Sequence, residues 1–543
     1  MYNIGMKNAD PVFNGPDQRL YYNAVQLALP LSTLIKVPDD DMLYSFLGAV
    51  RGVNFSRYVK PIRSNNTHSH DRGMLVKVLL FAYMNRIYSL EDIVQHCHTD
   101  IRFIYLSNGE KPSKMAFSRV ANQLTESIDS LMRDLNLEII DDTGIDPHTQ
   151  FVDGTKIEAN AYKNSFVYKK RILNAREDLF KDISKAVTSL NLSYGYSYEV
   201  RDRYCSLEIW FIVQYLMEVM VHENIEIRYG KGTRKSDIQK RYDILLGYAM
   251  RLSSYEYWLY VIGNRNSCSK TDQDATFMAT KWDYYNRSGV TRPCYNCQIA
   301  VSEGFIVNSE IYQSPGDTVT WMPFMERFNR LYGYYPKDPV ADAGYGGYDN
   351  YLFNIRHGID LVQKFPMYGK EHDKRFSKSH PYNPFNWDID DTDGFRICPN
   401  GRKFSQYEGD SPSRTRAGNL SILQKYTEPR HCEDCPLRDE CIPKYNKRGY
   451  RQISLNVVGE QLKEEARAQL DSEKGIDLKI KRSEQAEGAF GVIKEDMRYT
   501  RFHRRGLKNV KMEFLLVIMG YNLRKYHHWR LFRQASGQPA MMS

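Results

Sequence analysis

The sequence has no apolar run long enough to cross a membrane. Its longest apolar stretches, Val78–Met84 and Phe514–Met519, fall far short of the roughly 18 residues that a membrane-spanning helix needs. The first residues, Met1–Gly5, lack the basic segment and the apolar core of a signal peptide. We therefore expect a soluble protein of the cytoplasm with no membrane partner.

Two familiar catalytic signatures are also missing. There is no Gly-x4-Gly-Lys-Ser/Thr loop, so we expect no use of ATP, and there is no Gly-x-Ser-x-Gly nucleophile elbow. Cysteine is scarce and odd in number, at 9 of 543 residues, which argues against a disulfide framework. Free thiols fit the reducing cytoplasm.

Positive charge is in mild excess and is concentrated near the C-terminus. The chain has 75 Lys and Arg against 66 Asp and Glu, which gives a net charge of +9. Residues 494–533 alone hold eleven Lys and Arg against three acids, a local excess of +8. Such a basic stripe is the footprint expected for a nucleic-acid partner, although a solvated helix face gives the same count.

The first 140 residues show a helical pattern. Apolar residues recur at helical spacing in Leu43–Val50, Gly73–Ile87, Leu90–His96 and Lys114–Arg133, with Ser89 and Ser113 placed as N-caps. Short helices joined by tight turns are typical of helix-turn-helix DNA-binding modules, but ordinary helical hairpins share the pattern.

Strand signals begin after residue 145. Phe151–Ile157 has the pattern of a buried strand with an acid in its middle, and Tyr168–Asn264 returns to helical spacing. The pattern then predicts a hairpin of Asn296–Val301 and Phe305–Tyr312, a helix capped by Asp317 and ending near Leu331, a strand at Pro339–Asp342, a helix at Tyr348–Arg356 and a strand at Asp360–Phe365. This alternation predicts a mixed α/β core.

Composition divides the rest of the chain. Residues 366–450 are rich in Pro, Asn, Asp, Arg and Cys and show little periodicity, whereas residues 472–494 and Val510–His527 are helical in pattern. We therefore predict a helical N-terminal DNA-binding domain (1–140), a first core strand (145–165), a helical insertion (166–268), a central core (269–368), a small cysteine-containing insertion (369–455) and C-terminal helices (456–543).

Three carboxylates are candidates for catalysis. Asp153 lies in an apolar strand, where a charge is costly unless it is paired or binds a metal. Asp342 ends another strand just before a glycine-rich turn, where α/β sheets place catalytic groups. Glu487 is followed by Gly488 and Gly491, which destabilise a helix and leave room for close approach. Taken singly, each acid is equally explained as a loop residue, an N-cap or a partner in an ion pair.

The surroundings of Glu487 extend this hypothesis. On an α-helical wheel, Lys494, Arg498 and Arg501 fall within about 40° of Glu487, while the rival acid Glu484 is rotated by about 60°. Carboxylates on two strands and a helix suit the pair of Mg²⁺ (or Mn²⁺) ions, about 3.5–4 Å apart, that performs phosphoryl transfer.

Three segments resemble the signatures of DDE transposases of bacterial insertion sequences. They are Asp153-Gly154-Thr155, Ala341–Tyr345 and Glu487–Lys494. The region Leu75–Leu124 and the apolar helix after Arg504-Arg505-Gly506 are also similar to that family. A related signature, Tyr-x2-Arg-x3-Glu-x6-Lys, is matched by Glu487 and Lys494, whereas its Tyr and Arg positions hold Ile480 and Ser483, with Arg482 adjacent.

The resemblance implies an RNase H-like α/β catalytic core, with a mixed five-stranded sheet flanked by helices. Asp153 would lie on the first strand, Asp342 after the fourth, and Glu487 on the following helix, and the three acids would hold two Mg²⁺ (or Mn²⁺) ions. The implied partners are double-stranded DNA, as element ends and as target, and a second copy of the chain, in a homodimer on paired ends at the bacterial nucleoid.

We therefore expect cleavage at the ends of an element, followed by joining of the 3′-hydroxyls to target DNA. The phosphates would be bound by the basic residues after the glutamate, namely Lys494, Arg498, Arg501, Arg504, Arg505 and Lys508. The alternatives are an RNase H-like nuclease without strand transfer and a non-catalytic DNA-binding regulator derived from a transposase.

Four further cysteines have a spacing compatible with a structural Zn²⁺ site. Cys432-x2-Cys435-x5-Cys441, together with Cys398 upstream, would supply four tetrahedral ligands, and the segment has little apolar core of its own. His431 is an alternative ligand, and four free thiols are the alternative to any metal. Cys294-x2-Cys297 opens a predicted strand and is better explained by core packing.

Overall fold

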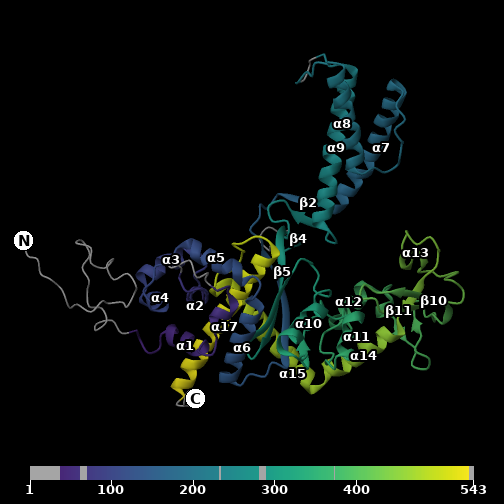
Figure 1. Cartoon of the computed structure of the whole chain (residues 1–543). Coiled ribbons are helices and arrows are strands. Elements are labelled where there is room, and N and C mark those ends of the chain that lie inside the picture. The colour runs from purple at the N-terminus through teal and green to yellow at the C-terminus, as the bar shows by residue number, and fades with distance from the viewer. Residues whose placement is uncertain (1–36, 62–69, 231–233, 281–288, 372, 537–543) are drawn as a thin grey trace, which may run out of the picture.

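The computed structural model describes residues 37–61, 70–230, 234–280, 289–371 and 373–536. The predictions for Met1–Gly5 and for the rest of residues 1–36 lie outside these ranges. Helices cluster on one side of a central sheet, a three-helix arm rises from it, and a small module rich in strands lies on the other side (Figure 1). None of the described helices combines the length and the apolar character that a membrane span needs.

The central sheet is five-stranded and mixed. Its members are β1 (Thr149–Glu158), β4 (Thr276–Ala279), β5 (Thr291–Ser302), β6 (Phe305–Tyr312) and β7 (Asp338–Val340). The long strand β5 pairs antiparallel with β4 and β6 along one edge and with β1 along the other, and β1 pairs parallel with β7. The predicted hairpin is confirmed, and its two-residue turn, Glu303-Gly304, has the positive φ angles (47° and 87°) that such turns require.

The strand predicted at Asp360–Phe365 is largely wrong. Among the described residues this segment forms a single bridge, between Gln363 and Ala341. The neighbouring strand β7 contains Pro339, which has no N–H to donate to a ladder, and the Gln363 side chain donates to the Pro339 carbonyl instead. The segment therefore runs beside β7 without becoming a regular strand.

The two faces of the sheet are covered by different helices. Val152 and Ala300 pack under α10 (Trp321–Tyr332) and α11 (Tyr348–Arg356). The opposite face carries Phe151, which packs with Leu478 and Ala486 from the C-terminal segment. Because side chains alternate along a strand, Asp153 points to the same face as Phe151. The predicted cap of α10 is wrong, since Thr320 rather than Asp317 precedes the helix.

The N-terminal region is helical, as predicted. Its helices are α1 (Met42–Ala49), η3 (Phe55–Tyr58), α2 (Arg72–Met84), α3 (Leu90–Thr99), α4 (Ile101–Leu106), α5 (Lys114–Leu124) and α6 (Ile128–Thr143). Ser89 and Ser113 are confirmed as N-caps. The single helix predicted for Lys114–Arg133 is wrong, because the Thr125 and Ser127 hydroxyls bond backbone carbonyls and break the helix between α5 and α6.

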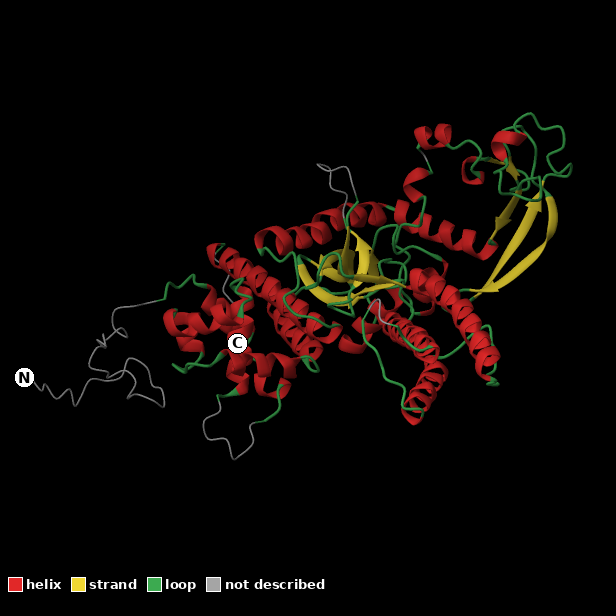
Figure 2. Cartoon of the chain, turned by 90° about the horizontal axis from the view of Figure 1, so that it is seen from above, coloured by secondary structure: helices red, strands yellow, loops and turns green. Residues whose placement is uncertain are grey.

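The last helix, α17 (Leu507–Ala535), belongs to the same core as the N-terminal helices. It packs against α1, α2 and α6 and against strand β6. At Gly520 the two backbones come so close that an added Cβ would lie 2.7 Å from the Tyr83 carbonyl oxygen. Figure 1 shows α17 among these helices, and the view from above shows helices gathered beside the central sheet (Figure 2).

The arm confirms the helical pattern predicted for Tyr168–Asn264. It consists of α7 (Lys169–Tyr194), α8 (Ser206–His222) and α9 (Asp237–Ile262), which share their own apolar core. At its base, β2 (Phe166–Tyr168) pairs with β3 (Ser267–Ser269).

The cysteine module contains more strand than its sequence predicts. It holds η4 (Tyr368–Lys370), α12 (Lys374–Ser379), η5 (Pro384–Asn386), β8 (Asp388–Ile389), β9 (Arg396–Ile397), β10 (Gln406–Arg414), β11 (Leu420–Thr427), α13 (Arg438–Cys441) and β12 (Gln452–Leu455). Strands β10, β11 and β12 form an antiparallel sheet. Most residues of β10 are exposed on both faces, so the strand lacks the apolar alternation that would have revealed it.

A chain of helices leads from this module to the sheet. It consists of α14 (Val457–Asp471), α15 (Glu473–Arg482), a π turn η6 (Ser483–Glu487), α16 (Gly488–Gly491) and a second π turn η7 (Val492–Asp496). The helix predicted for residues 472–494 is thus present, but two π turns interrupt it.

Candidate active site

The strand register places two of the predicted acids side by side. In the parallel pair of β1 and β7, Phe151 lies opposite Val340. Continuing that register by two residues puts Asp153 opposite Asp342 on strands that are about 4.7–4.9 Å apart. The Asp342 carboxylate is held in place by the Gly344 amide, which donates to Oδ1 over 2.8 Å.

The third acid comes to this edge on the π turn η6. Arg482 lies between the acids, with Nη1 at 4.0 Å from Asp153 Oδ1 and Nη2 at 3.5 Å from Glu487 Oε1. Residues five apart are about 140° apart on an α-helix, and the wider π turn brings Arg482 and Glu487 together. Glu487 and the rival acid Glu484 are both exposed, and the contact between Arg482 and Glu487 favours Glu487 as the third member of the site.

The same π turns overturn the predicted basic ladder on the glutamate helix. The helical segment ends at Asp496, and Arg498 beyond it has a positive φ of 54°. Arg501 forms a backbone bridge with Glu158, and its guanidinium donates to the Ala159 and Ala161 carbonyls. An α-helical wheel therefore does not describe where Arg498 and Arg501 lie relative to Glu487.

Burial and charge make the acid cluster receptive to cations. Burial, with a smaller contribution from the charges of Asp342 and Glu487, raises the pKa of Asp153 to about 6. A backbone hydrogen bond from Gly154 and the charge of Arg482 act in the opposite direction. Lys364 shows the opposite effect. Burial, with the nearby charges of Arg482 and Lys479, lowers its pKa, and the charge of Asp342 only partly offsets this. The ionised form of Asp153 is thus destabilised by its surroundings, and a bound cation would stabilise it.

The three acids fit a divalent metal by their chemistry. Their oxygens are the hard ligands that Mg²⁺ prefers, and they reach one sheet edge from three separate elements. Across the described ranges, no three His, Cys, Asp or Glu side chains already converge tightly enough to hold an ion. At this edge the Arg482 guanidinium lies where it contacts two of the acids.

A buried polar network packs against Gly154, the residue after Asp153. The sequence did not predict it. Gly154 lies opposite Gln298 on β5, and a Cβ on Gly154 would come within 2.2 Å of the Gln298 amide nitrogen. That amide donates to Asp317 over 2.9 Å and accepts from the Tyr345 hydroxyl. Glycine after Asp153 is therefore a packing requirement, and the Asp-Gly pair was the only sequence signal for this network.

The remaining basic candidates lie in different settings. Lys494 Nζ donates to the Thr155 hydroxyl over 2.5 Å, two residues along β1 from Asp153 and on the same face. Arg504 Nη1 donates to Asn122 on α5, and Arg505 Nε donates to the Asn160 carbonyl. Lys508 is exposed in the first turn of α17.

The predicted zinc ligands come together in the module. Cys398, Cys432, Cys435 and Cys441 line one pocket. Cys294 and Cys297 are buried in β5, which agrees with their predicted role in core packing. The structure thus separates the cysteines of the core from the four of the module.

Two family models match the chain. A transposase DDE domain matches residues 397–527, a range that includes Glu487 and the four module cysteines. A transposase domain of the DUF772 type matches residues 32–123, which include helices α1 to α4 and most of α5. No match was found among curated proteins or among solved structures.

Proposed function

We propose that this chain, a transposase whose DDE domain makes it a metal-dependent phosphoryl transferase, cuts the ends of a DNA element and joins the freed 3′-hydroxyls to target DNA. The observation that carries the proposal is the register that sets Asp153 beside Asp342, with Glu487 linked to Asp153 through Arg482. Such a cluster supports two-metal phosphoryl transfer. We propose that the reaction takes place on DNA in the cytoplasm, at the nucleoid.

The sheet supports an RNase H-like assignment for the core. An antiparallel hairpin, β5 and β6, flanks a central strand β1 that pairs parallel with β7 on its other side. Asp153 lies on that central strand, and Asp342 follows the next one. This arrangement, with one acid on the central strand and one after its parallel neighbour, supports the proposed roles of Asp153 and Asp342.

In this mechanism, Asp153, Asp342 and Glu487 would hold Mg²⁺ (or Mn²⁺), which supplies Lewis acidity and activates the attacking oxygen. Arg482 would contact the substrate phosphate when its carboxylate partners bind cations. Lys494, held by Thr155, would hold a second phosphate near Asp153. Water attacks the phosphodiester first and the 3′-hydroxyl attacks later, so one site serves both in-line steps.

The function is tested by incubating the purified chain with the DNA that flanks its gene, a supercoiled plasmid and Mg²⁺. A transposase produces both cleaved ends and plasmid-joined products. An RNase H-like nuclease produces cleavage alone, and a DNA-binding regulator produces neither. The two products are resolved on sequencing gels and on agarose gels.

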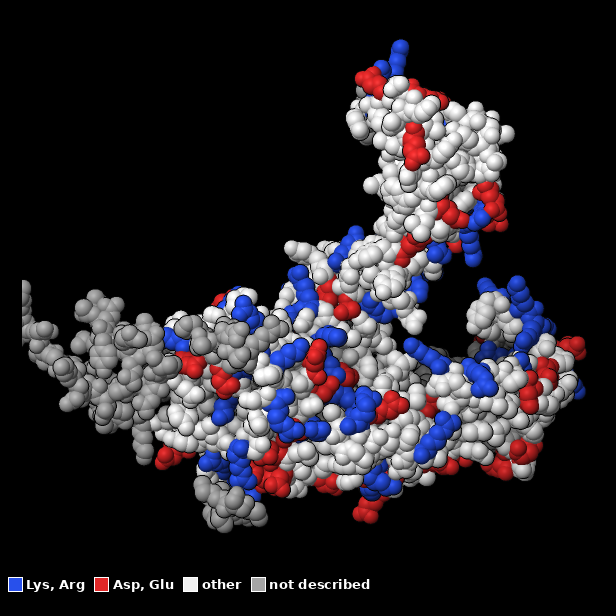
Figure 3. Space-filling view, viewed as in Figure 1, with Lys and Arg blue, Asp and Glu red and all other residues white. Residues whose placement is uncertain are grey.

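We propose that Lys494, Arg498, Arg501, Arg504, Arg505 and Lys508 contact DNA phosphates. Lys and Arg atoms gather over the central body and on the facing side of the cysteine module, whereas much of the arm surface in this view is uncharged (Figure 3). The N-terminal helices, which include Asn122 beside Arg504, would read the end sequences.

Replacing Lys508 with alanine is expected to weaken binding of all DNA sequences to the same extent. Each lost phosphate contact lowers the slope of log K against log salt by about one unit. Titrations of end DNA and of unrelated DNA at several salt concentrations measure this slope. Lys181→Ala, an exposed lysine on the arm, should leave it unchanged. A loss confined to end DNA would contradict the assignment of Lys508.

We propose that the chain acts as a homodimer that contacts its partner through the arm, because joining two ends requires two active sites. On α8, Leu207, Phe211 and Val221 are 75%, 71% and 65% exposed, and they lie within about 40° of Leu207 around the helix. Leu207 and Phe211 also line a groove of 420 Å³. The arm holds 15 Lys and Arg against 12 acids between residues 169 and 262, a near balance that favours a protein partner over DNA.

Replacing Phe211 with glutamate is expected to convert the dimer to monomers. Association would bury an unpaired charge among the exposed apolar side chains of α8, which opposes dimer formation. Sedimentation velocity of the DNA-free protein measures the change. Phe532→Glu, an apolar residue 74% exposed at the end of α17, serves as the matched control and should remain dimeric. A wild-type chain that sediments as a monomer would overturn the proposed arm contact.

A further inference from the structure

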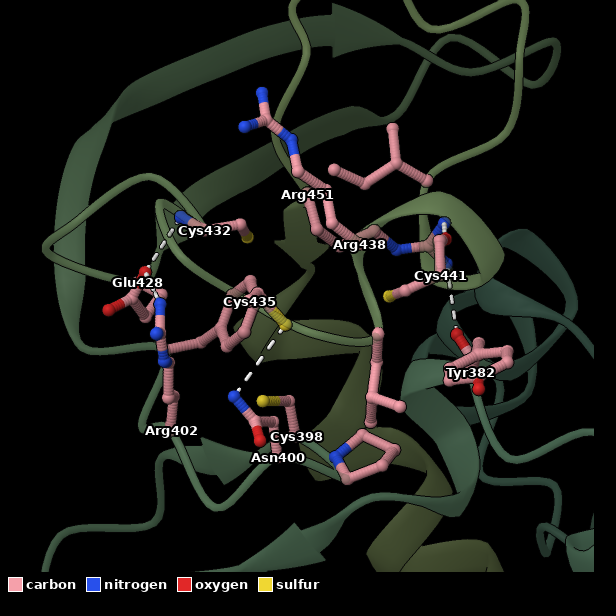
Figure 4. A pocket seen from close by; sticks show the side chains of 14 residues that line it. Tyr382, Cys398, Asn400, Arg402, Glu428, Cys432, Cys435, Arg438, Cys441 and Arg451 are labelled. Atoms are coloured by element: carbon pink, nitrogen blue, oxygen red, sulfur yellow. Dashed lines mark hydrogen bonds and ion pairs between the residues drawn. The ribbon is translucent and has the colours of Figure 1, made fainter.

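Four cysteine side chains from three segments of the module face one small pocket. Cys398 follows β9, Cys432 and Cys435 lie in the loop after β11, and Cys441 ends α13 (Figure 4). The sequence left the participation of Cys398 open because it lies 34 positions before Cys432. In the structure it lines the same pocket as the other three, whereas His431 does not.

The pocket has the size of a single ion. Its cavity measures 20 Å³, which admits one water-sized particle and no organic ligand. All four cysteines that line it are free thiols. They are therefore available as ligands for one ion.

The surroundings of the pocket suit a thiolate cluster. Asn400 Nδ2 donates to Cys435 Sγ over 3.6 Å. Arg451 Nε is buried at the pocket with no hydrogen-bond partner among the described residues. Such N–H groups orient and stabilise metal-bound sulfur. Arg402 and Arg438 also line the pocket, so three guanidinium groups lie there. Arg402 is 3.6 Å from the Glu428 carboxylate, which leaves two to balance the charge of −2 that four thiolates and one Zn²⁺ would carry.

The module also needs the folding energy that a metal supplies. Its buried apolar cluster contains only four residues, Trp387, Phe404, Cys432 and Ile453, among the described part of the chain. The loop that carries Cys432 holds three non-glycine residues at positive φ, His431, Cys432 and Asp434, with angles between 50° and 60°. Strained backbone of this kind persists only where other contacts hold it in place.

We propose that Cys398, Cys432, Cys435 and Cys441 bind one structural Zn²⁺ ion, which closes the module. Within the described residues the thiols do not yet converge on a single point, so binding would turn them inward to about 2.3 Å from the ion, with release of their protons. The site lies apart from the three catalytic acids and does not depend on the proposed DNA reaction. Strand β12 leaves the module directly into α14, so zinc would order the segment that leads toward Glu487.

The test is elemental analysis of the full chain after dialysis against buffer that contains Mg²⁺ and no chelator. We expect one zinc and no iron per chain, and loss of most of that zinc in Cys435→Ser and Cys441→Ser. Cys205→Ser is the matched control, because Cys205 is exposed at the N-terminus of α8 and serine is a favourable cap there. That variant should keep its zinc.

A second measurement covers variants that fold poorly. Wild-type protein refolded with Co²⁺ should show the thiolate-to-cobalt absorption of a tetrahedral site, and Zn²⁺ should displace it. The proposal is overturned if the wild-type chain contains less than a tenth of an equivalent of zinc and gains no thermal stability from added Zn²⁺. It is also overturned if iron replaces zinc, or if thiol titration finds the four cysteines paired as disulfides.

Discussion

Replacing Asp342 with asparagine is expected to lower the rate of DNA cleavage by about 10³-fold or more, because lost metal Lewis acidity costs several kcal/mol of transition-state stabilisation. DNA binding should stay within about twofold of the wild type, since the phosphate contacts come from other residues. The amide keeps the size of the carboxylate and its Oδ1 still accepts from Gly344, so the turn should hold. Single-turnover cleavage and filter binding measure the two effects separately.

The matched control is Glu484→Gln, on the same helical segment as Glu487. Both glutamates are exposed, but Glu487 contacts Arg482, which also contacts Asp153. Glu484→Gln should therefore keep full activity, whereas Glu487→Gln should match Asp342→Asn. If Glu484→Gln abolishes cleavage and Glu487→Gln does not, the third acid is misassigned. If Asp342→Asn abolishes DNA binding together with cleavage, its role is structural.

Replacing Glu513 with leucine is expected to lower the free energy of unfolding by about 3–5 kcal/mol, the usual cost of removing one partner from a buried charged network. Glu513 is 1% exposed on α17 and accepts hydrogen bonds from the Tyr499 hydroxyl and from the His503 and Arg504 amides. Leucine would leave these donors buried without an acceptor. Urea unfolding followed by circular dichroism measures the loss.

The Glu513 network also predicts a pH dependence. A hydrogen bond to Glu513 raises the pKa of His503 above its ordinary value, so their pairing contributes stability at pH values below the ordinary histidine pKa of about 6.5. That contribution is lost as pH rises through the raised pKa. The gap between the wild type and Glu513→Leu should therefore be larger at pH 6 than at pH 9. Glu495→Leu, at an exposed position, should change stability by less than about 0.5 kcal/mol at either pH.

Asp153 and Asp342 could be recognised from sequence because buried strands have a simple apolar pattern, in which an acid stands out. Asp153 lies inside an apolar strand and Asp342 follows another, so each acid could be picked out from the local pattern. That the two strands are neighbours was implied only by the family resemblance, and the register of β1 and β7, continued by two residues, supports it.

The contact of Glu487 with Arg482 could not be predicted from sequence, because it depends on a π turn. The insertion of extra residues into helical turns is decided by packing against β1 and β5, and no local pattern announces it. For that reason the α-helical wheel placed Arg498 and Arg501 beside Glu487 and passed over Arg482. The β10–β11 pair was missed because β10 lacks apolar alternation. The contacts of Gln298 were missed because they join residues far apart in the sequence. The proposed domain boundaries and the roles of the basic residues stay predictions.

Because α17 lies at the C-terminal end of the chain, the N-terminal helices can complete their apolar core only late in translation. The N-terminal helices complete their core only when residues 507–535 pack against α1, α2 and α6. At about 5–20 residues per second, translation of the residues between α6 and α17 delays that event by roughly 20 to 70 s. A polypeptide truncated before α17 would lack this core, so a shortened product of the gene would not persist as a free DNA-binding competitor. If the N-terminal helices read the DNA ends as proposed, recognition of those ends would be coupled to completion of the whole chain.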